Sequence, residues 1–222
     1  MPSPFAHPAA VLALAPLMGR LVVRTLVRPF VDRQVYECLT LKAAGTGQCA
    51  SRARVGGVQV KELSHAELAR WRSVSALEIS EKFLRTLAQR PDRCFGAFIG
   101  DALVSYVFFA PASPTAIDEQ LRFRFPRDSI YIYKAFTLPA WRGKGLLPNL
   151  LTVAMRRLEC RDFVTLVLSG NRNSRKAFEH CGFQLDQRFT VWKVLARPVR
   201  ATVPGHPGFC IDARDPWLAG RV

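Results

Sequence analysis

Two glycines alternate with two basic residues in Arg142-Gly143-Lys144-Gly145, between a strand-like apolar run and a leucine-rich run. A helix that begins here would present unpaired N–H groups and the positive end of its dipole. Glycine lets the backbone approach an anion closely, and the arginine and lysine add positive charge. Together these features are typical of a site for phosphate or pyrophosphate. The P-loop spacing G-x-x-x-x-G-K-[ST] is absent, and an exposed glycine turn with solvated basic side chains is the alternative interpretation.

A second group of residues follows the next apolar run. Asn171, Ser174 and Phe178 are separated by three and four residues, so they can share one face of a helix. Gly182 and Phe183 come shortly after this segment, and a glycine in that place is typical of a helix end. The sequence therefore predicts one helix face that carries these three side chains.

The elements that must position these groups alternate along the chain. β-Prone apolar runs predict strands, including a hairpin around Gly100-Asp101, and a capping box at Ser64 and Glu67 starts a helical region that ends near Gln89. The predicted strands are 34–41, 58–63, 94–99, 102–110, 129–138, 163–169 and 189–195, and the later helices are 148–160 and 173–181. Residues 42–57 and 111–128 are interpreted as loops, and the chain from Arg197 onward as an irregular tail. This order favours an α/β sheet with helices on its faces.

The order and spacing of the two groups resemble the GNAT superfamily of acetyl-CoA-dependent N-acetyltransferases. That family has a strand ending V-x-P, a [QR]-x-x-G-x-[GA] loop and, further on, an N-x-x-[AS]-x-x-x-[YF]-x-x-x-G-F element. The matching residues here are Thr137-Leu138-Pro139, then Arg142, Gly145 and Leu147, then Asn171, Ser174, Phe178, Gly182 and Phe183. The resemblance implies a central mixed sheet with helices on both faces, in which two parallel strands splay apart to form the acyl-CoA cleft. It covers 58–196, so 1–57 is expected to be a basic arm with the first strand, and 197–222 a Pro/Gly-rich tail.

The resemblance also implies where acetyl-CoA, the acyl donor, would bind. Pantetheine would follow the strand end, the pyrophosphate would rest on the loop amides, and Asn171 and Ser174 would contact the pantetheine arm or the adenine side. The implied cofactor-binding residues are Phe136, Thr137, Leu138, Arg142, Gly143, Lys144, Gly145, Leu146, Leu147, Asn171, Ser174 and Phe178.

Departures from the family pattern concern the pyrophosphate loop and the proton transfers. Leu147 stands where the family prefers a glycine or alanine, and Phe178 stands where many members have a tyrosine that protonates the leaving thiolate. The strand at 131–137 contains no carboxylate, although members often place a general base there. We take Tyr131 and Tyr133, which share one strand face, as candidate catalytic residues that relay a proton through water. Aromatic residues packed on a sheet are the alternative interpretation.

The charge of the chain bears on its partners. Lys and Arg number 32 against 17 Asp and Glu, a formal net charge of +15, and such a field attracts anions. We therefore expect an amine-bearing small-molecule acceptor that is acidic or an amino sugar. The second hypothesis is a catalytically weak GNAT-like module that binds nucleic acid or an anionic membrane surface, and steep salt dependence without CoA binding would favour it.

The N-terminal arm and the cysteines bear on location. Arg20, Arg24 and Arg28 recur every four residues, so a helix there would lie on an anionic membrane, dock a partner, or pack on the protein itself. The apolar run before it is shorter than the roughly 20 residues that cross a bilayer. The 6 cysteines include no C-x-x-C pair and accompany no histidine cluster, so no metal site is predicted. We expect reduced thiols in a cytoplasmic protein that is peripheral to the membrane if the arm binds lipid.

Overall fold

The computed structural model describes residues 31–44, 55–116, 121–158, 161–194, 197–202 and 208–213. Within these ranges the main sheet has eight strands in the order β10-β9-β1-β8-β7-β4-β3-β2. Their bounds are β1 Val31–Leu41, β2 Val58–Leu63, β3 Arg93–Ile99, β4 Ala102–Ala110, β7 Ser129–Thr137, β8 Asp162–Leu168, β9 Gln184–Val194 and β10 Arg197–Thr202. A smaller sheet has the order β11-β6-β5, with β5 Thr115–Ala116, β6 Leu121–Arg124 and β11 Cys210–Ala213.

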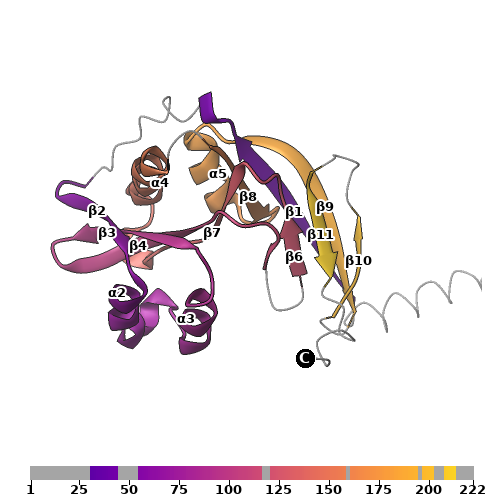
Figure 1. The fold of residues 1–222 in the computed structure, drawn as a ribbon. Coiled ribbons are helices and arrows are strands. Elements are labelled where there is room, and N and C mark those ends of the chain that lie inside the picture. Colours follow the sequence, from indigo (N-terminus) through magenta and orange to yellow (C-terminus); the bar gives the residue numbers. More distant parts are fainter. Residues whose placement is uncertain are drawn as a thin grey trace, which may run out of the picture.

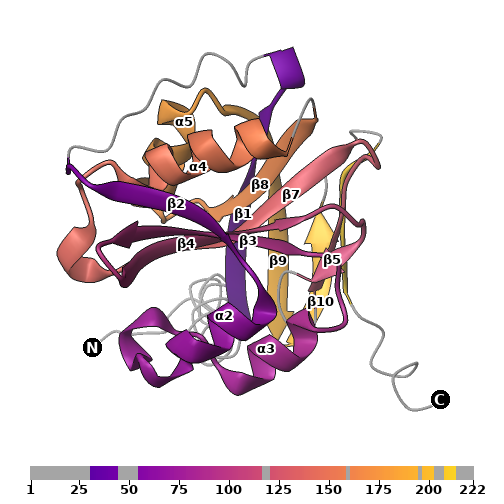
Figure 2. The same cartoon turned by 60° about the vertical axis from the view of Figure 1, so that its left-hand side comes forward.

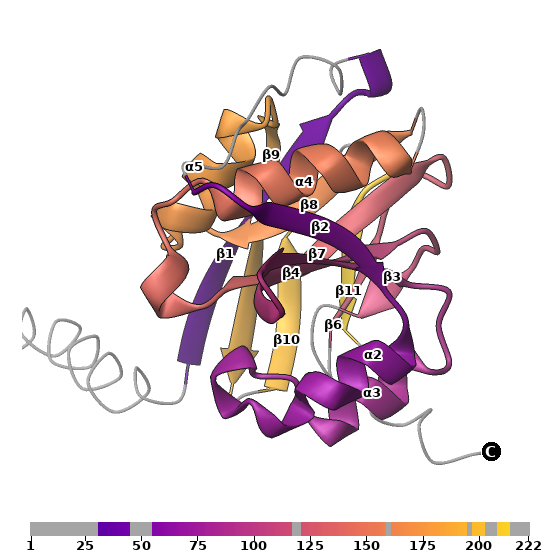
Figure 3. The same cartoon turned by 90° about the vertical axis from the view of Figure 1, so that its left-hand side faces the viewer.

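Helices cover both faces of the main sheet (Figure 2). Two of them, α4 (Leu146–Arg157) and α5 (Arg172–His180), lie on one face. On the other face lie α2 (His65–Arg70) and α3 (Glu81–Leu87), as Figure 3 shows from the side. Short 3-10 turns complete the chain: η3 Trp71–Ser73, η4 Ser75–Leu77 and η5 Pro139–Trp141. The α/β fold with a mixed sheet and helices on both faces is therefore confirmed.

The local signals in the sequence explain several of these elements. Ser64 caps α2, where its hydroxyl accepts from the Glu67 amide while the Glu67 carboxylate accepts from the Ser64 amide, which completes the predicted capping box. Strands β3 and β4 form the predicted hairpin around Gly100, which adopts φ 55°. Gly182, with φ 89°, directly follows α5 and lets the chain turn into β9.

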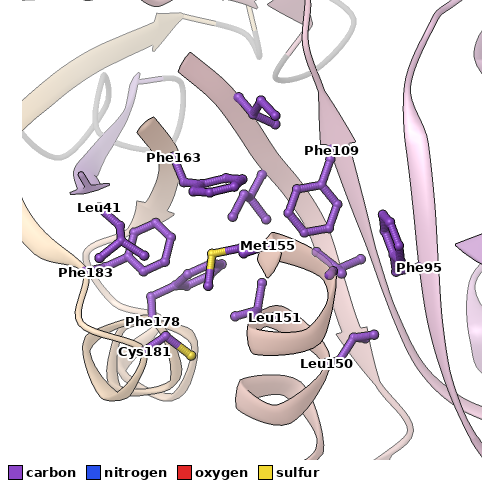
Figure 4. Close-up of a cluster of buried hydrophobic side chains, with 14 of the residues drawn as sticks. Leu41, Phe95, Phe109, Leu150, Leu151, Met155, Phe163, Phe178, Cys181 and Phe183 are labelled. Atoms are coloured by element: carbon purple, nitrogen blue, oxygen red, sulfur yellow. The ribbon is translucent and has the colours of Figure 1, made fainter. Parts of the chain in front are cut away.

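Three apolar clusters hold the layers together. The first lies between the main sheet and the helices α4 and α5, where Leu151 and Met155 meet Phe163 and Phe178 (Figure 4). The second lies between the main sheet and the small sheet, and Phe123 sits at its centre. The third lies under α2 and α3. Large, fully buried rings in all three clusters fix the helices and the small sheet against the main sheet.

Strands β7 and β8 form the parallel pair of the main sheet. Their ladder runs from Ser129 opposite Asp162 to Ile132 opposite Thr165 and ends there, although β7 continues to Thr137 and β8 to Leu168. The two strands therefore diverge beyond Ile132 (Figure 1). This is the splayed pair that the resemblance implies.

Strand β1, which lies in the segment 1–57, is part of the main sheet. It pairs antiparallel with β8, from Tyr36 opposite Leu168 to Leu41 opposite Phe163. It also pairs antiparallel with β9, from Val31 opposite Val194 to Thr40 opposite Gln184. Figure 1 shows β1 between these two strands. Residues from the start of the described chain therefore join β8 to β9 in the sheet.

Two predictions of irregular structure are wrong. The predicted loop 111–128 contains β5 and β6, and the predicted irregular tail contains β10 and β11. The β11–β6 pairing joins distant segments, which local sequence patterns do not reveal. Strand β10 pairs with β9 directly before it, in a stretch whose prolines and glycines favoured irregular structure. Pro198 stands in the edge strand beside a register shift, where its missing N–H is tolerated. The predicted amphipathic helix with Arg20, Arg24 and Arg28 lies outside the described residues.

Candidate active site

A cavity of about 670 Å³ opens where β7 and β8 diverge. It brings together side chains from β1, β7, β8, α3 and α5. The predicted catalytic tyrosines of β7 and the three predicted cofactor-binding residues at α5 all reach it. The lining residues are Tyr36, Ser80, Lys82, Phe83, Thr86, Leu87, Arg90, Tyr131, Tyr133, Lys134, Ala135, Thr165, Leu166, Val167, Leu168, Asn171, Ser174 and Phe178. The predicted strand end at 136–138, which includes the last two residues of β7, and the predicted loop at 142–147 after it do not line the cavity.

The glycine-rich loop forms a bare helix N-terminus. Gly143 and Gly145 both adopt φ 74°, a left-handed conformation that side chains disfavour. Gly145 is the N-cap of α4, and no side chain caps this helix. The amides of Leu146 and Leu147 in its first turn have no partner within the helix. A Cβ added at Gly143 would meet nothing within 4 Å, so the backbone there faces open space, as an anion site requires.

The basic residues of this loop are held beside η5. The Nε of Arg142 donates to the carbonyl of Thr137 at 3.0 Å, and its guanidinium lies 5.8 Å from the centroid of the Phe136 ring. The Nζ of Lys144 lies 4.4 Å from the centroid of the Trp141 ring. Cation–π contacts of this kind stabilise by about 0.5–1 kcal/mol at exposed sites, so both side chains can turn toward a bound anion at little cost.

The strand end at 136–138 uses part of its backbone within the sheet. The Leu138 amide donates to the Val104 carbonyl at 2.9 Å, and the Ser105 hydroxyl donates to the Phe136 carbonyl at 2.7 Å. Alternate residues of a strand direct their backbone groups to opposite sides. The backbone of Thr137 therefore points away from β4, toward the opening between β7 and β8.

Helix α5 presents its first turn to the cavity. Asn171 is its N-cap, and its Oδ1 accepts from the Ser174 amide at 3.1 Å. Phe178 lies one turn further along, is 3% exposed, and contacts the Phe183 ring edge-on at 5.2 Å. The three residues that were predicted to share a helix face thus all line the same cavity.

Tyr131 and Tyr133 lie side by side on the face of β7 that is turned toward α3. Their rings stack with centroids 5.8 Å apart and 7° between the planes. Burial raises the pKa of both hydroxyls well above the ordinary range of tyrosine. The Tyr133 hydroxyl donates to Asp92 Oδ2 at 2.6 Å. Both candidate catalytic tyrosines therefore reach the cavity as neutral phenols, and one of them is coupled to a carboxylate.

Asp92 and Lys134 are the site residues that the sequence reasoning missed. The Asp92 side chain is 1% exposed and pairs with Arg90, whose Nε lies 2.9 Å from Oδ2. Burial raises the pKa of this carboxyl. Asp92 lies 41 positions before Tyr133, so no local signal marks it.

Lys134 lies on a bulge of β7. It adopts φ 47° at the point where two residues of β7 oppose one residue of β4. Its Nζ lies 4.2 Å from the centroid of the Phe83 ring and donates to the Glu78 carbonyl at 3.3 Å. Burial lowers the pKa of this lysine. A bulge that redirects a side chain is typical of a functional site.

Within the described ranges, no cluster of three or more His, Cys, Asp or Glu side chains is arranged to hold a metal ion. None of the helices in those ranges combines the length and the apolar character that crossing a bilayer requires.

Comparisons with known proteins agree with this fold. A profile of the family described as "Acetyltransferase (GNAT) family" matches residues 60–183, which is more than half of the chain. The chain therefore belongs to the GNAT acetyltransferase family. No curated protein matches it.

Solved structures are similar in fold. A tandem GNAT protein from the clavulanic acid biosynthesis pathway has a TM-score of 0.53 at 18% identity and matches 90% of this chain and 62% of its own. A conserved protein of unknown function from Staphylococcus epidermidis has a TM-score of 0.54 at 10% identity, with 78% and 67% covered. A Drosophila protein has a TM-score of 0.51 at 15% identity, with 83% and 58% covered. The chain thus spans between 58% and 67% of these three proteins.

Proposed function

We propose that this protein transfers an acetyl group from acetyl-CoA to a primary amine of a small acceptor that is acidic or an amino sugar. The observation that carries the proposal is the cavity at the divergence of β7 and β8, which joins the α5 face to the two tyrosines of β7. One side of that cavity can take the acyl donor and the other the amine. The transfer then occurs between two groups that the sheet holds in place.

The residues present fit a CoA pyrophosphate. The N-terminus of α4 lacks a side-chain cap, and the backbone at Gly143 faces open space. Backbone amides at a helix N-terminus bind phosphate groups well, and the side chains of Arg142 and Lys144 would add positive charge beside them. The backbone of Thr137, on the open side of β7, would bind pantetheine, and Asn171 and Ser174 would contact it from α5. Phe178 would pack beside the thioester.

An acidic acceptor fits the charge of the other half of the cavity. Lys82, Arg90 and Lys134 line it, and no carboxylate side chain is among the described residues that do so. Lysine and arginine in a partly desolvated cleft attract anionic ligands. A phosphate or carboxylate on the acceptor would therefore hold its amine near Tyr133.

Acetyl transfer to an amine also requires proton transfers. Amines near neutral pH are mostly protonated and must lose a proton before they attack. Once deprotonated, the amine nitrogen bonds to the acetyl carbon while the carbon–sulfur bond breaks and the thiolate leaves. Phe178 has no proton to give, so water carries the second proton of the amine nitrogen to the thiolate, which leaves an amide and the CoA thiol. Acetyl-CoA supplies the activated acyl group; the protein orients it and excludes competing water.

Cytoplasmic location is part of the proposal. Cys38 and Cys94 are buried thiols, and burial raises the pKa of both, so neither needs an oxidising compartment. Contact of the N-terminal arm with an anionic membrane would add a peripheral location.

Calorimetric titration with acetyl-CoA tests the proposal. Saturable binding near one molecule per chain is expected, and Gly145→Glu should abolish it by placing a carboxylate in the phosphate site. Gly57→Glu is the matched control, because Gly57 has φ 75° against 74° for Gly145 and a Cβ added at Gly57 would meet nothing within 4 Å. It carries the same backbone strain before β2, the edge strand of the sheet.

Titrations with single-stranded DNA and with vesicles of anionic lipid test the second hypothesis. If the wild-type protein binds either of them with steep salt dependence and does not bind acetyl-CoA, the transferase proposal is wrong. If acetyl-CoA binds, release of CoA thiol is followed with glucosamine 6-phosphate, 2-aminoethyl phosphate and their uncharged counterparts, glucosamine and ethanolamine. Faster turnover of the phosphorylated amines would support the acidic acceptor.

A further inference from the structure

Tyr133 connects the cavity to the buried carboxylate of Asp92. Asp92 Oδ2 accepts from the Tyr133 hydroxyl at 2.6 Å and lies 2.9 Å from the Nε of Arg90. The guanidinium of Arg90 also donates to the Thr115 hydroxyl and lies 5.8 Å from the centroid of the Tyr133 ring. Tyr133 and Arg90 line the cavity and Asp92 does not, so Asp92 acts on a ligand only through these two residues, and of the two Tyr133 can both accept and donate a proton.

The second oxygen of Asp92 is unusual. Oδ1 is buried and has no hydrogen-bond partner within the described residues. An unpaired buried polar atom costs about 1–3 kcal/mol, and more when it belongs to a charged group. Protonation of the carboxyl removes the charge and reduces this cost. The site therefore favours a carboxyl that can take up a proton over one that only anchors Arg90.

We propose that Asp92 is the final proton acceptor for the acceptor amine, and that Tyr133 conducts the proton to it. This inference rests on the proposed acetyl transfer. The ammonium group of the acceptor gives a proton to the Tyr133 oxygen while the Tyr133 O–H proton moves to Asp92 Oδ2. The amine becomes neutral with its lone pair free, tyrosine is a neutral phenol before and after, and the Asp92 carboxylate becomes a carboxylic acid. The proton returns to solvent after the transfer.

The surroundings of the two groups support this route. Arg90 and His65 face Asp92 and favour its charged form, while burial, the largest influence, raises the pKa of its carboxyl. Tyr133 faces Asp92, Arg90 and Cys94, and the pKa of its hydroxyl is raised chiefly by burial. A phenolate at Tyr133 is therefore disfavoured, so the proton does not stop there. A buried carboxylate of raised pKa is a better base than an exposed aspartate.

The pH dependence of kcat/KM separates this role from a structural one. With the relay intact, kcat/KM rises as Asp92 ionises and then becomes constant, although the free amine is still protonated. In Asp92→Asn only the small neutral fraction of the amine can react. The variant should be about 100-fold slower near pH 7, and its deficit should shrink as the pH approaches the pKa of the amine.

The experiment measures kcat/KM from pH 5.5 to about 10 with glucosamine 6-phosphate and 2-aminoethyl phosphate, in Asp92→Asn, Tyr133→Phe and the double variant. The double variant should be no slower than the slower single one, because the residues act as one unit. Asp128→Asn, an exposed carboxylate just before β7, is the control and should keep the wild-type profile. Parallel profiles for wild type and Asp92→Asn, or multiplicative losses, would overturn the proposal.

A carboxyl ¹³C NMR titration gives a second test that needs no turnover. The Asp92 signal, assigned by its loss in Asp92→Asn, should titrate above the ordinary range of aspartate. It should move higher in Tyr133→Phe, because the hydrogen bond from Tyr133 favours the carboxylate. An unchanged titration in Tyr133→Phe would refute the coupling. Failure of the relay with intact acetyl-CoA binding leaves the transferase proposal standing, whereas absent acetyl-CoA binding removes both.

Discussion

The hydroxyl of Thr165 donates a hydrogen bond of 2.9 Å to the carbonyl of Ile132, at the residue pair where the ladder between β7 and β8 ends. This bond closes the apex from which the two strands diverge. Thr165→Val keeps the shape but removes this buried hydrogen bond, at a cost of about 1.5 kcal/mol. We expect Tm to fall by about 3–6 °C and acetyl-CoA affinity to fall with it, measured by calorimetry.

Thr152→Val is the matched control for the apex. Thr152 is also a buried threonine, and its hydroxyl donates to the Pro148 carbonyl at 2.8 Å. That carbonyl also accepts from the Cys181 thiol and lies in a helix whose own ladder pairs it. The control should lose less stability. Equal losses of stability in the two variants would mean that the Thr165 bond stabilises the protein no more than any other buried threonine bond.

Phe178 offers a gain-of-function prediction. Its ring lines the cavity, where many family members carry a tyrosine that protonates the thiolate, and it is 3% exposed. In Phe178→Tyr, burial would keep the new hydroxyl protonated and able to donate. We expect kcat, followed by thiol release, to rise by about tenfold if thiolate release limits turnover. Unchanged kcat with unchanged acetyl-CoA affinity would place the hydroxyl out of reach of the sulfur.

The sequence revealed the elements whose signals are local. The capping box at Ser64, the hairpin at Gly100 and the end of α5 near Gly182 all depend on neighbours within a few residues, and each formed as predicted. The strand β11 depends on β6, far away in the chain, whereas β10 pairs with β9 directly before it but lies in a Pro/Gly-rich stretch that favoured irregular structure. The position of β1 between β8 and β9 likewise depends on partners far away in the chain, and the pattern of a strand does not predict which strands it pairs with.

The same distinction holds for the site. Asn171, Ser174 and Phe178 share one helix, so their spacing placed them on one face, and the structure brings that face to the cavity. Asp92 meets Tyr133 only because β3 and β7 flank β4 in the sheet. Lys134 reaches the cavity through a bulge that no residue type in this strand predicts. Contacts that depend on the register of two or three strands could therefore not be predicted from the sequence.

Glu37 ties β1 to the elements that surround it. Its carboxylate is 3% exposed and accepts from Arg175 on α5 and Arg188 on β9, each at 3.1 Å. Glu37→Gln removes the charge but leaves both arginines able to reach water, since they are 34% and 58% exposed. We expect a loss of about 2 kcal/mol, below the usual cost of breaking a fully buried pair, measured by urea denaturation.

The control for Glu37 uses the same arginine. Glu179 accepts from the Nε of Arg175 at 2.7 Å on the surface of α5. An exposed i,i+4 pair contributes about 0.3–0.5 kcal/mol, so Glu179→Gln should change stability little. If the two variants lose the same stability, β1 is not anchored through Glu37.

Lys134 should select acidic acceptors, and its selection should depend on pH. Burial lowers the pKa of its ammonium group, so the charged form that binds an anion is lost at a lower pH than for an ordinary lysine. The KM for 2-aminoethyl phosphate should therefore begin to rise below the usual range of lysine titration. For stability the sign is opposite, because the cost of burying the charge is present below the lowered pKa and disappears as the pH rises.

The variant Lys134→Met keeps the aliphatic stem and removes the charge. We expect its KM for 2-aminoethyl phosphate to rise by about tenfold, which equals about 1.4 kcal/mol, while the KM for ethanolamine changes little. Lys61→Met is the control, because Lys61 also lies over a phenylalanine ring, that of Phe98, but away from the cavity. An equal rise in KM for both amines would indicate a general disturbance of the bulge, and a rise confined to the phosphorylated amine would locate acceptor recognition at Lys134.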